Sequence, residues 1–212
     1  MTTEDALVRA ILDSPEEDGP RLAYADYLDE TPSPKRRARA EFIRLQVGFS
    51  KGAAFDRELL ARESAALRKF GSAWLPRWGR REVGPAYTIG YMVFVTRVGG
   101  GEMNFSFKRG FVNSCTAQIG EGMGLVPEGV GEFVRDTLAA HPVEKFFIYW
   151  AGSMVLSVHV AHGPGGWTGE TKRDRCRGLV GPVGTRREFV SALVEAATEA
   201  ASAVRPPAGF AF

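Results

Sequence analysis

Hydrophobic residues recur at helical spacing over roughly the first seventy positions of the chain. One apolar stripe predicts a first helix that ends near Asp13: Ala6, Leu7, Ala10 and Ile11. Residues 14–18 then have the order of a capping box, with a serine as the cap and a glutamate three residues later. We therefore expect a second helix to begin there, with its acidic residues at the end that the helix dipole favours. Pro20 is expected to restart or kink this helix.

Two further helices are predicted before residue 80. In the one that begins near Lys35, four apolar residues share one side: Ala38, Phe42, Leu45 and Phe49. Arg37 and Arg44 fall on the opposite side, so these cations are expected to face solvent. Asp56 is placed to cap the last helix of the group, which extends to about Phe70.

Beyond residue 81 the pattern changes to alternating β-branched and aromatic residues. Residues 86–119 predict three antiparallel strands, with a tight turn or a bulge at Lys108, Arg109 and Gly110, just before Phe111. The remaining expected elements are a helix over 129–140, strands over 144–150 and 154–161, a glycine-rich basic loop over 163–184, and a last helix capped by Thr185.

This order of elements predicts an α+β fold, in which about four N-terminal helices pack on a mainly antiparallel sheet with two further helices. We expect a boundary near residue 80, which divides the chain into a helical region, 1–80, and an α+β region, 81–212. The helix–strand unit over 129–150 is a candidate for a leucine-rich-repeat-like unit.

The net charge of the 212-residue chain is only +2, but the charges are unevenly distributed. Residues 1–30 hold nine acids and two bases, whereas residues 31–81 hold thirteen bases and four acids. Such asymmetry is typical of a basic surface for nucleic acid, or of two oppositely charged helical layers that attract each other.

A cytoplasmic location is expected. Cys115 and Cys176 are far apart and fit neither a disulfide framework nor a metal-ligand spacing, which indicates a reducing compartment. The acidic N-terminus lacks the features of a secretory signal. The uncharged stretch 146–161 is shorter than the ~20 residues of a spanning helix, so two buried strands explain it better and no membrane partner is expected.

Candidate catalytic and metal-binding residues are few. His159 and His162, with Cys176 as a third ligand, are poorly spaced for a zinc site, because strand residues at odd separations point to opposite faces. Tyr24 and Asp26 could act as an acid and a base only in a pocket that shifts their pKa values; packing and ion pairing explain them more simply. The glycine-rich segments lack the pattern of nucleotide-binding loops. We therefore expect no catalytic residue, no metal and no cofactor.

Nucleic-acid binding is the alternative that the basic segments favour. The cations that could contact phosphates lie in three places: residues 35–39, residues 172–177, and Arg186 with Arg187. Trp167 could stack on a base. This alternative predicts one continuous positive surface that joins Arg37 and Arg44 to the 172–177 segment.

Two N-terminal segments, ALVRAILDSPEEDGPRLAYADYLDE and RARAEFIRLQ, carry a specific pattern. Over residues 5–47 they closely resemble the bacterial repeat-companion domain, whose members read much like ilad-PeDDaPRLvYADWLeErGdpraEFIRLQ. The similarity continues more loosely through residues 59–75 and through the segments FKRGFV and LAAHPVEKFFI. Tyr27 stands where the family generally has tryptophan, and no leucine-rich array follows in this chain.

The resemblance implies a companion of protein-interaction repeats and brings no enzymatic activity with it. The residues that match the family motif are Pro20, Arg21, Leu22, Tyr24, Ala25, Asp26, Leu28, Glu41, Phe42, Ile43, Arg44, Leu45 and Gln46. Its apolar members are explained by packing. Among the polar ones, Asp26 is expected to pair with Arg44 or Arg21 and so to fix how the second and third helices cross.

The favoured hypothesis is a non-enzymatic protein-interaction or scaffolding module, which predicts an exposed apolar patch beside the turn at residues 107–111. Its candidate interaction or ion-pair residues are Arg21, Asp26, Arg37, Arg44, Lys108, Arg109 and Phe111. A nucleic-acid-binding protein is the first alternative. The second is an enzyme of unknown class, which requires a concave pocket between the two regions with at least two titratable groups in contact.

Overall fold

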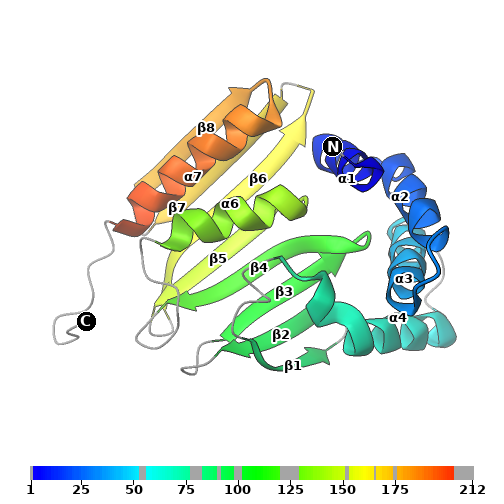
Figure 1. Ribbon diagram of the computed structural model, residues 1–212. Helices are drawn as coiled ribbons and strands as arrows, with labels where there is room; N and C mark the ends of the chain where they lie inside the picture. The colour runs from blue at the N-terminus through cyan, green and yellow to red at the C-terminus, as the bar shows by residue number, and fades with distance from the viewer. Residues whose placement is uncertain are drawn as a thin grey trace.

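The structure is a computed structural model that describes residues 2–52, 56–76, 83–89, 92–97, 102–119, 129–150, 153–164, 166–173 and 176–202. These residues form the predicted α+β fold, in which helices lie at one end and on one face of a mainly antiparallel sheet (Figure 1). Among the helices described, none combines the length and the apolar character needed to cross a membrane.

Four helices and a short 3₁₀ helix come first: α1 (Thr3–Asp13), α2 (Gly19–Asp29), α3 (Pro34–Ser50), α4 (Arg57–Phe70) and η1 (Gly71–Trp74). The end of α1 and the cap at Asp56 are as predicted. The start of α2 is not, because this helix begins at Gly19, with Pro20 in its first turn and no capping box at Ser14. Residues 14–18 instead form a turn between two helices, in which the Glu17 N–H donates to the Ser14 carbonyl oxygen at 3.1 Å.

The strands form one eight-stranded sheet in which neighbours along the chain are neighbours in space. They are β1 (Val83–Ile89), β2 (Met92–Arg97), β3 (Glu102–Lys108), β4 (Phe111–Ile119), β5 (Lys145–Trp150), β6 (Ser153–Gly163), β7 (Gly166–Arg173) and β8 (Cys176–Val183). The first part of the sheet thus has four strands where three were predicted. Only β4 and β5 pair in parallel, through the crossover helix α6 (Val130–Ala140).

The single parallel pair corrects the expectation of a leucine-rich-repeat-like unit over 129–150. Such a repeat needs strands that are parallel on both sides, whereas β5 pairs with β6 in the antiparallel sense. The predicted loop over 163–184 is also wrong, since it contains β7 and β8. Gly169 explains the error: a Cβ there would lie 2.9 Å from Leu193 and 3.0 Å from Phe189, so this strand needs glycine where a helix packs closely on it.

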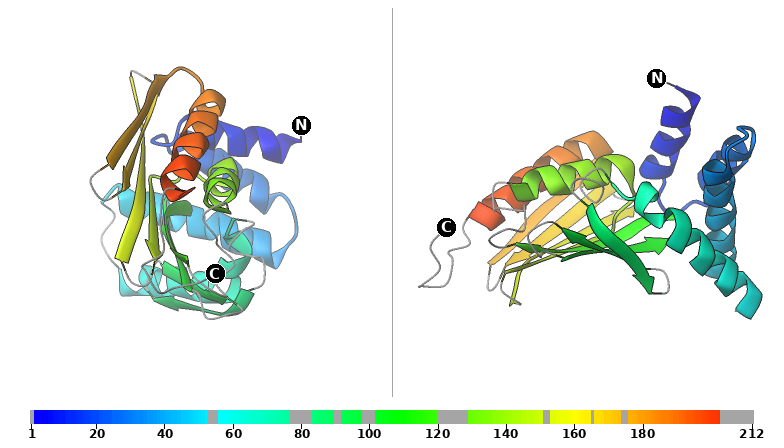
Figure 2. Two further views of the ribbon diagram at one scale, coloured as in Figure 1. Left: turned by 90° about the vertical axis from the view of Figure 1, so that its left-hand side faces the viewer. Right: turned by 60° about the horizontal axis from the view of Figure 1, so that its bottom comes forward.

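The sheet region consists of two successive units with the same order of elements, four strands and then a helix. The first ends with α6, and the second ends with α7 (Arg186–Ser202). Both helices carry the sequence Glu-Phe-Val from their third residue, and the two phenylalanines, Phe133 and Phe189, are fully buried. The helices lie side by side on one face of the sheet (Figure 2). They approach so closely that a Cβ on Gly131 would meet the Thr198 hydroxyl at 2.2 Å.

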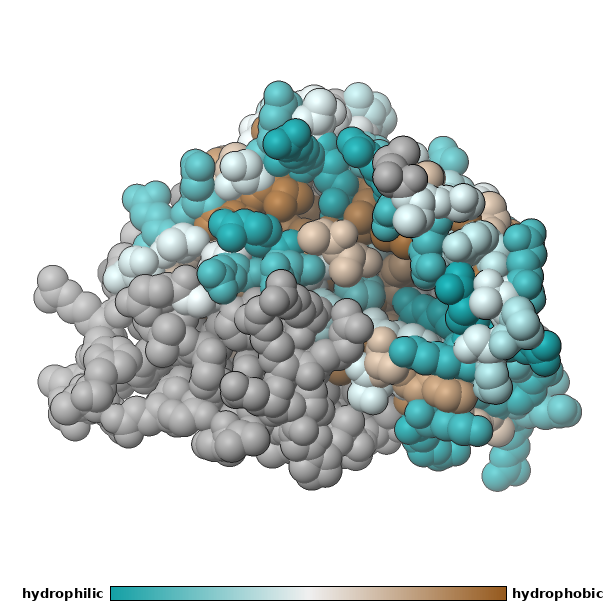
Figure 3. Space-filling view, in the orientation of Figure 1, coloured by the Kyte–Doolittle hydropathy of each residue, from teal (hydrophilic) through white to brown (hydrophobic). Residues whose placement is uncertain are grey.

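The largest hydrophobic core runs between this sheet face and the helices, and the N-terminal region contributes to it. Phe42, Leu67, Trp74 and Leu75 belong to the same buried cluster as the strand residues. A second cluster joins α1, α2 and α3 to Phe111 at the start of β4. The helical region is therefore packed on the sheet through two sets of contacts. Figure 3 shows hydrophobic surface between the α6–α7 layer and the N-terminal helices, edged by hydrophilic side chains.

Candidate binding site between the helices and the sheet

The tip of the β3–β4 hairpin is one place where the helical region meets the sheet. Arg109 and Gly110 form its turn, with φ values of 50° and 84°. Glycine adopts such positive values far more easily than other residues. A Cβ built on Gly110 would lie 2.4 Å from Cγ1 of Ile43 and 2.8 Å from its Cα. Glycine is thus required here both by the backbone conformation and by the close approach of α3.

Gln46 on α3 binds the backbone of this turn. The Gly110 N–H donates to the side-chain oxygen of Gln46 at 2.7 Å, and the Gln46 amide nitrogen donates to Glu63 at 2.8 Å. Gln46 and Glu63 are both buried, and an unpaired amide or carboxylate would be costly at such a site. One side chain of the family motif therefore connects α3, α4 and the hairpin.

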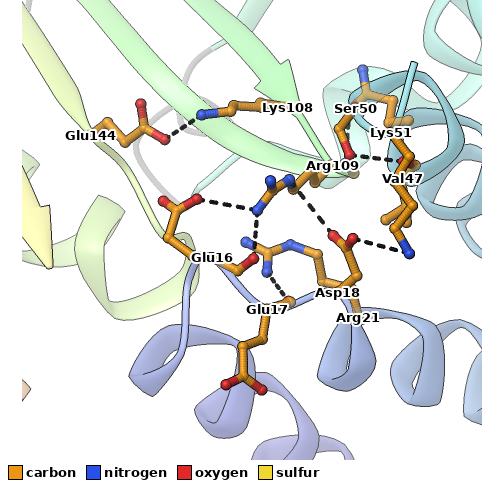
Figure 4. Close-up of polar contacts among 12 residues, drawn as sticks. Glu16, Glu17, Asp18, Arg21, Val47, Ser50, Lys51, Lys108, Arg109 and Glu144 are labelled. Atoms are coloured by element: carbon orange, nitrogen blue, oxygen red, sulfur yellow. Dashed lines mark hydrogen bonds and ion pairs between the residues drawn. The ribbon is translucent and has the colours of Figure 1, made fainter. Parts of the chain in front are cut away.

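The Arg109 side chain holds the turn between α1 and α2 against the same hairpin (Figure 4). Its Nη1 donates to the Glu16 carbonyl oxygen at 2.7 Å and lies 3.3 Å from the Glu16 carboxylate. Its Nε lies 3.6 Å from Asp18, which also pairs with Lys51 at 3.2 Å. Glu16 and Asp18, which were expected to complement a helix dipole, thus bind a cation of the sheet instead.

Arg21 is buried beneath this segment. Its Nη1 donates to the Glu17 carbonyl oxygen at 2.6 Å, and its guanidinium lies 5.9 Å from the centre of the Phe111 ring. Burial is the main reason that the pKa of Arg21 falls to about 10, which still leaves the side chain charged at neutral pH. Arg21 therefore holds the chain segment that leads into α2.

Asp26 pairs with Arg44, one of the two partners expected for it. The ion pair measures 2.7 Å, and Arg44 also contacts Asp29 at 2.6 Å. The side chains of Asp26 and Arg44 are 73% and 40% exposed. The hydrogen bond to Asp26 is the main cause that raises the pKa of Arg44. The pair links α2 to α3 across the surface, where solvent weakens it.

The hairpin tip is not the exposed interaction surface that the sequence suggested. Phe107 and Phe111 are 4% and 3% exposed, because α2 and α3 cover them. Lys108 pairs with Glu144 at 2.7 Å. Within residues 107–111, which the structure describes in full, no apolar patch remains at the surface. The prediction failed because the N-terminal motif itself occupies this surface.

The described residues of the basic segments proposed for nucleic acid lie on different parts of the molecule (Figure 1); the side chains of residues 173–177 lie outside the described set, so the predicted continuous surface stays a prediction. Arg37 is exposed on α3, whereas Lys172 lies on β7, on the opposite side of the molecule in Figure 1. Residues 174 and 175 lie outside the described part of the chain. Arg186 points inward, where it donates to the carbonyl oxygen of Leu138 and lies 5.5 Å from the Trp167 ring centre.

A cavity of about 830 Å³ lies between α1, α2, α3, η1 and the end of α6; we call it the junction cavity. Four basic and two acidic residues line it: Arg9, Lys35, Arg36, Arg39, Glu4 and Asp5. Its apolar lining includes Val8, Leu12, Leu28, Leu75 and Phe111. The site therefore combines an excess of positive charge with apolar walls, as ligand sites for amphipathic anions do.

Most polar groups of the junction cavity are already paired. Tyr24 donates to Glu4 at 2.9 Å, and Arg36 contacts the other oxygen of Glu4 at 3.3 Å. The Asp5 carboxylate accepts from the Thr2 N–H in a capping box, which lowers the pKa of Asp5. Burial and the adjacent Glu4 raise the pKa of Tyr24 to about 12, away from the range in which it could exchange protons at neutral pH.

Three buried donors of the junction cavity have no hydrogen-bond partner: Nε of Arg36, Nη1 of Arg39 and Nε1 of Trp74. Arg36 is nevertheless paired with Glu4 through its Nη2, whereas Arg39 and Trp74 have no polar partner among the described residues. The guanidinium carbon of Arg39 lies 4.8 Å from the Trp74 ring centre and 5.0 Å from that of Phe111. Burial lowers the pKa of Arg39 to about 10, so it remains a cation at neutral pH. Arg39 was predicted only as part of the basic segment 35–39, with no role distinct from its neighbours, and Trp74 was not predicted as a site residue. The available signal was position, since Arg39 precedes Phe42, Ile43 and Gln46 at helical spacing on the buried side of α3.

The three histidines lie apart from one another in the described part of the chain. His141 lines the junction cavity, but its Nδ1 accepts from the Val112 N–H at 3.3 Å. His159 and His162 are exposed on β6. Among the residues that the structure describes, no group of three or more potential ligands could hold a metal ion. The side chain of Cys176 lies outside the described set.

Comparison of the chain with protein-family models, with curated proteins and with solved structures found no match. The junction between helices and sheet therefore has to be interpreted from its own residues.

Proposed function

We propose that this chain is a non-enzymatic protein-interaction module and that its partner binds in the junction cavity. The observation that carries the proposal is the composition of this cavity, which combines apolar walls with more basic than acidic side chains at the meeting point of two regions. Interfaces that bind specifically need both buried apolar contacts and charges that select the partner.

The paired polar residues where the N-terminal helices meet the hairpin support a role without catalysis. Gln46, Arg109 and Arg21 bind backbone groups of the turns that they hold, so each has a structural partner. The junction cavity does contain two titratable groups in contact, Tyr24 and Glu4, as an enzyme would require. However, the raised pKa of Tyr24 leaves it neutral, and the His141 Nδ1 is occupied by a backbone N–H. These groups hold the cavity in shape and are poorly placed to transfer protons.

Photo-crosslinking inside the cells from which the protein comes tests the proposal. A photoreactive residue in place of Lys35, on the edge of the junction cavity, is expected to give a discrete protein adduct. The matched control replaces Lys172, an exposed lysine on β7 remote from the cavity. Identical adducts from both positions would contradict a binding site in the junction cavity. A nucleic-acid adduct from Lys35 would favour the nucleic-acid alternative.

A further inference from the structure

We infer that Arg39 and Trp74 form a binding site for a carboxylate group at the inner end of the junction cavity. This goes beyond the proposed function, because it names the chemistry of the ligand and holds whether a protein or a small acid carries the carboxylate. Arg39 is 7% exposed and Trp74 is likewise 7% exposed, so the two donors belong to the interior of the site.

The first support is a cation without a counter-ion. Arg39 has no ion pair within the described residues, and its neighbour Tyr24 is neutral at pH 7. Glu4 and Asp5 line the same cavity but are engaged by Tyr24, Arg36 and Thr2. A buried charge without a partner is costly, and aromatic faces offset only part of that cost. An anionic ligand would supply the missing charge.

The second support comes from comparison with two other arginines, Arg21, which is buried, and Arg186, which is partly buried. Burial lowers the pKa of Arg21, Arg39 and Arg186 to about 10 in each case. Arg21 donates to the Glu17 carbonyl oxygen, and Arg186 donates to that of Leu138. Arg39 alone among these three has no acceptor, although the fold supplies one for each of the others. This difference indicates an acceptor from outside the chain.

The third support is the neighbouring indole. Nε1 of Trp74 is a pure donor without a partner, and its ring lies 4.8 Å from the Arg39 guanidinium carbon. Two buried donors that line the same cavity suit one planar, singly charged group with two acceptor oxygens. A phosphate dianion would bring more acceptors than these two donors satisfy. The apolar lining formed by Val8, Leu12 and Leu28 would accept an aliphatic stem attached to the carboxylate.

The test uses the full chain and follows the four tryptophan indole N–H resonances by NMR, with Trp74→Phe to assign the one from Trp74. N-acetyl-leucine, a carboxylate with an apolar side chain, is expected to shift the Trp74 resonance saturably. N-acetyl-leucinamide, which has the same shape without the charge, and inorganic phosphate are expected to leave it in place. A shift with the amide as large as with the acid, or a shift with phosphate alone, would overturn the inference.

Substitutions sharpen this result. Arg39→Met keeps the length of the side chain and removes its donors, and it should weaken binding by about tenfold or more. Arg37→Met removes one charge from the exposed side of the same helix and should leave the affinity unchanged within about twofold. Trp74→Phe retains the aromatic ring, so weaker binding by this variant, followed by calorimetry, would assign the effect to the indole N–H. Unchanged binding by both Arg39→Met and Trp74→Phe would dismiss the site.

A second acid identifies the source of the carboxylate. Hexanoate has an apolar stem but no peptide group. Equal affinity for hexanoate and N-acetyl-leucine would assign the site to a small carboxylic acid, whereas a preference for N-acetyl-leucine would assign it to a peptide; both outcomes support a carboxylate site. If acid binding persists while crosslinking from Lys35 yields no protein adduct, the proposed protein partner is rejected and the carboxylate site is retained.

Discussion

The helical region touches the sheet in two places that differ in one respect. At the hairpin tip, the main polar residues of the contact are paired: the Gly110 N–H donates to Gln46, Gln46 donates to Glu63, and Arg109 donates to Glu16. Nε of Arg109 and Oδ1 of Asp18 make no hydrogen bond, but they lie 3.6 Å apart as an ion pair. In the junction cavity, Arg39 and Trp74 present donors to no partner. Both places lie next to Phe111, so the same strand end separates a contact whose charged residues are paired from one that holds an unpaired cation.

This difference indicates that the hairpin tip stabilises the fold, whereas the junction cavity binds a ligand. Buried polar groups in folded proteins are nearly always hydrogen-bonded, so the pairing of Gly110, Gln46 and Glu63 at the hairpin tip indicates a contact made for stability. Unpaired buried donors beside a cavity indicate a partner from outside the chain. The comparison therefore predicts large losses of stability for changes at the hairpin tip, and small ones for changes at Arg39.

The largest expected effect is that of Gly110→Ala. The new Cβ would lie 2.4 Å from Cγ1 of Ile43 and 2.8 Å from its Cα, in a residue with φ of 84°. Forced overpacking costs ~1–3 kcal/mol, and the left-handed conformation costs a non-glycine residue ~1–2 kcal/mol more. We expect the free energy of unfolding, measured with urea, to fall by about 3–4 kcal/mol.

Gly52→Ala is the matched control for this variant. Its φ is 80°, but nothing lies within 4 Å of a Cβ at that position. It should therefore lose only the conformational part, ~1–2 kcal/mol. Equal losses for the two variants would mean that the close contact between the hairpin and Ile43 does not stabilise the fold. The hairpin tip could then no longer be regarded as the stabilising one of the two places.

Gln46→Met is expected to have the next largest effect. Methionine has similar volume, but it leaves the Gly110 N–H and the Glu63 carboxylate buried without their partner. Each buried group left unpaired costs ~1–3 kcal/mol, so we expect a loss of about 2–4 kcal/mol in urea unfolding. Adding Glu63→Met to Gln46→Met should recover part of the loss, because one orphaned group is removed. A double variant less stable than Gln46→Met would contradict this account of the pairing.

Much of the fold could be predicted from residue spacing. The helices α1, α3, α4 and α6 follow from apolar stripes, because such a stripe exists only to be buried on one side of a helix. The strands β7 and β8 could not be predicted. Their glycine-rich sequence has low intrinsic preference for a strand, and Gly169 is there because Phe189 of α7, some twenty residues later, packs on it.

The site was harder to predict, because the partners of its polar residues are distant in the sequence. Arg109 was singled out, but the backbone of Glu16 that it binds is 93 residues away. The acids of residues 14–18 resembled a capping box locally, yet tertiary contacts with Arg109 determine their conformation. Arg39 was hidden in the basic segment KRRAR, where neighbouring cations such as Arg37 do face solvent. Its position on the buried side of α3 distinguished it, and charge alone did not.

A comparison of two arginines, Arg186 and Arg39, is expected to show a stability difference of intermediate size. Arg186 and Arg39 both lie over a tryptophan ring, but only Arg186 has carbonyl acceptors, those of Leu138 and His141. Arg186→Met should lose ~1–3 kcal/mol, because these carbonyls are left without a donor. Arg39→Met removes an unpaired buried charge and should change the stability by less than about 1 kcal/mol, or raise it. If thermal unfolding shows Arg39→Met to be the more destabilised variant, Arg39 is a structural residue.

The smallest effect is expected at the surface pair of α2 and α3. Asp26 is 73% exposed and its partner Arg44 is 40% exposed, so water screens the 2.7 Å contact between them. Asp29 also remains to bind Arg44 at 2.6 Å after Asp26→Ala. Exposed pairs typically contribute ~0.2–1 kcal/mol, and we expect Asp26→Ala to fall within that range in thermal unfolding. A loss as large as that of Gln46→Met would mean that Asp26 fixes the crossing of α2 and α3 as strongly as a buried contact does. The exposed fraction of a side chain would then not indicate which residues of the N-terminal segment stabilise this fold.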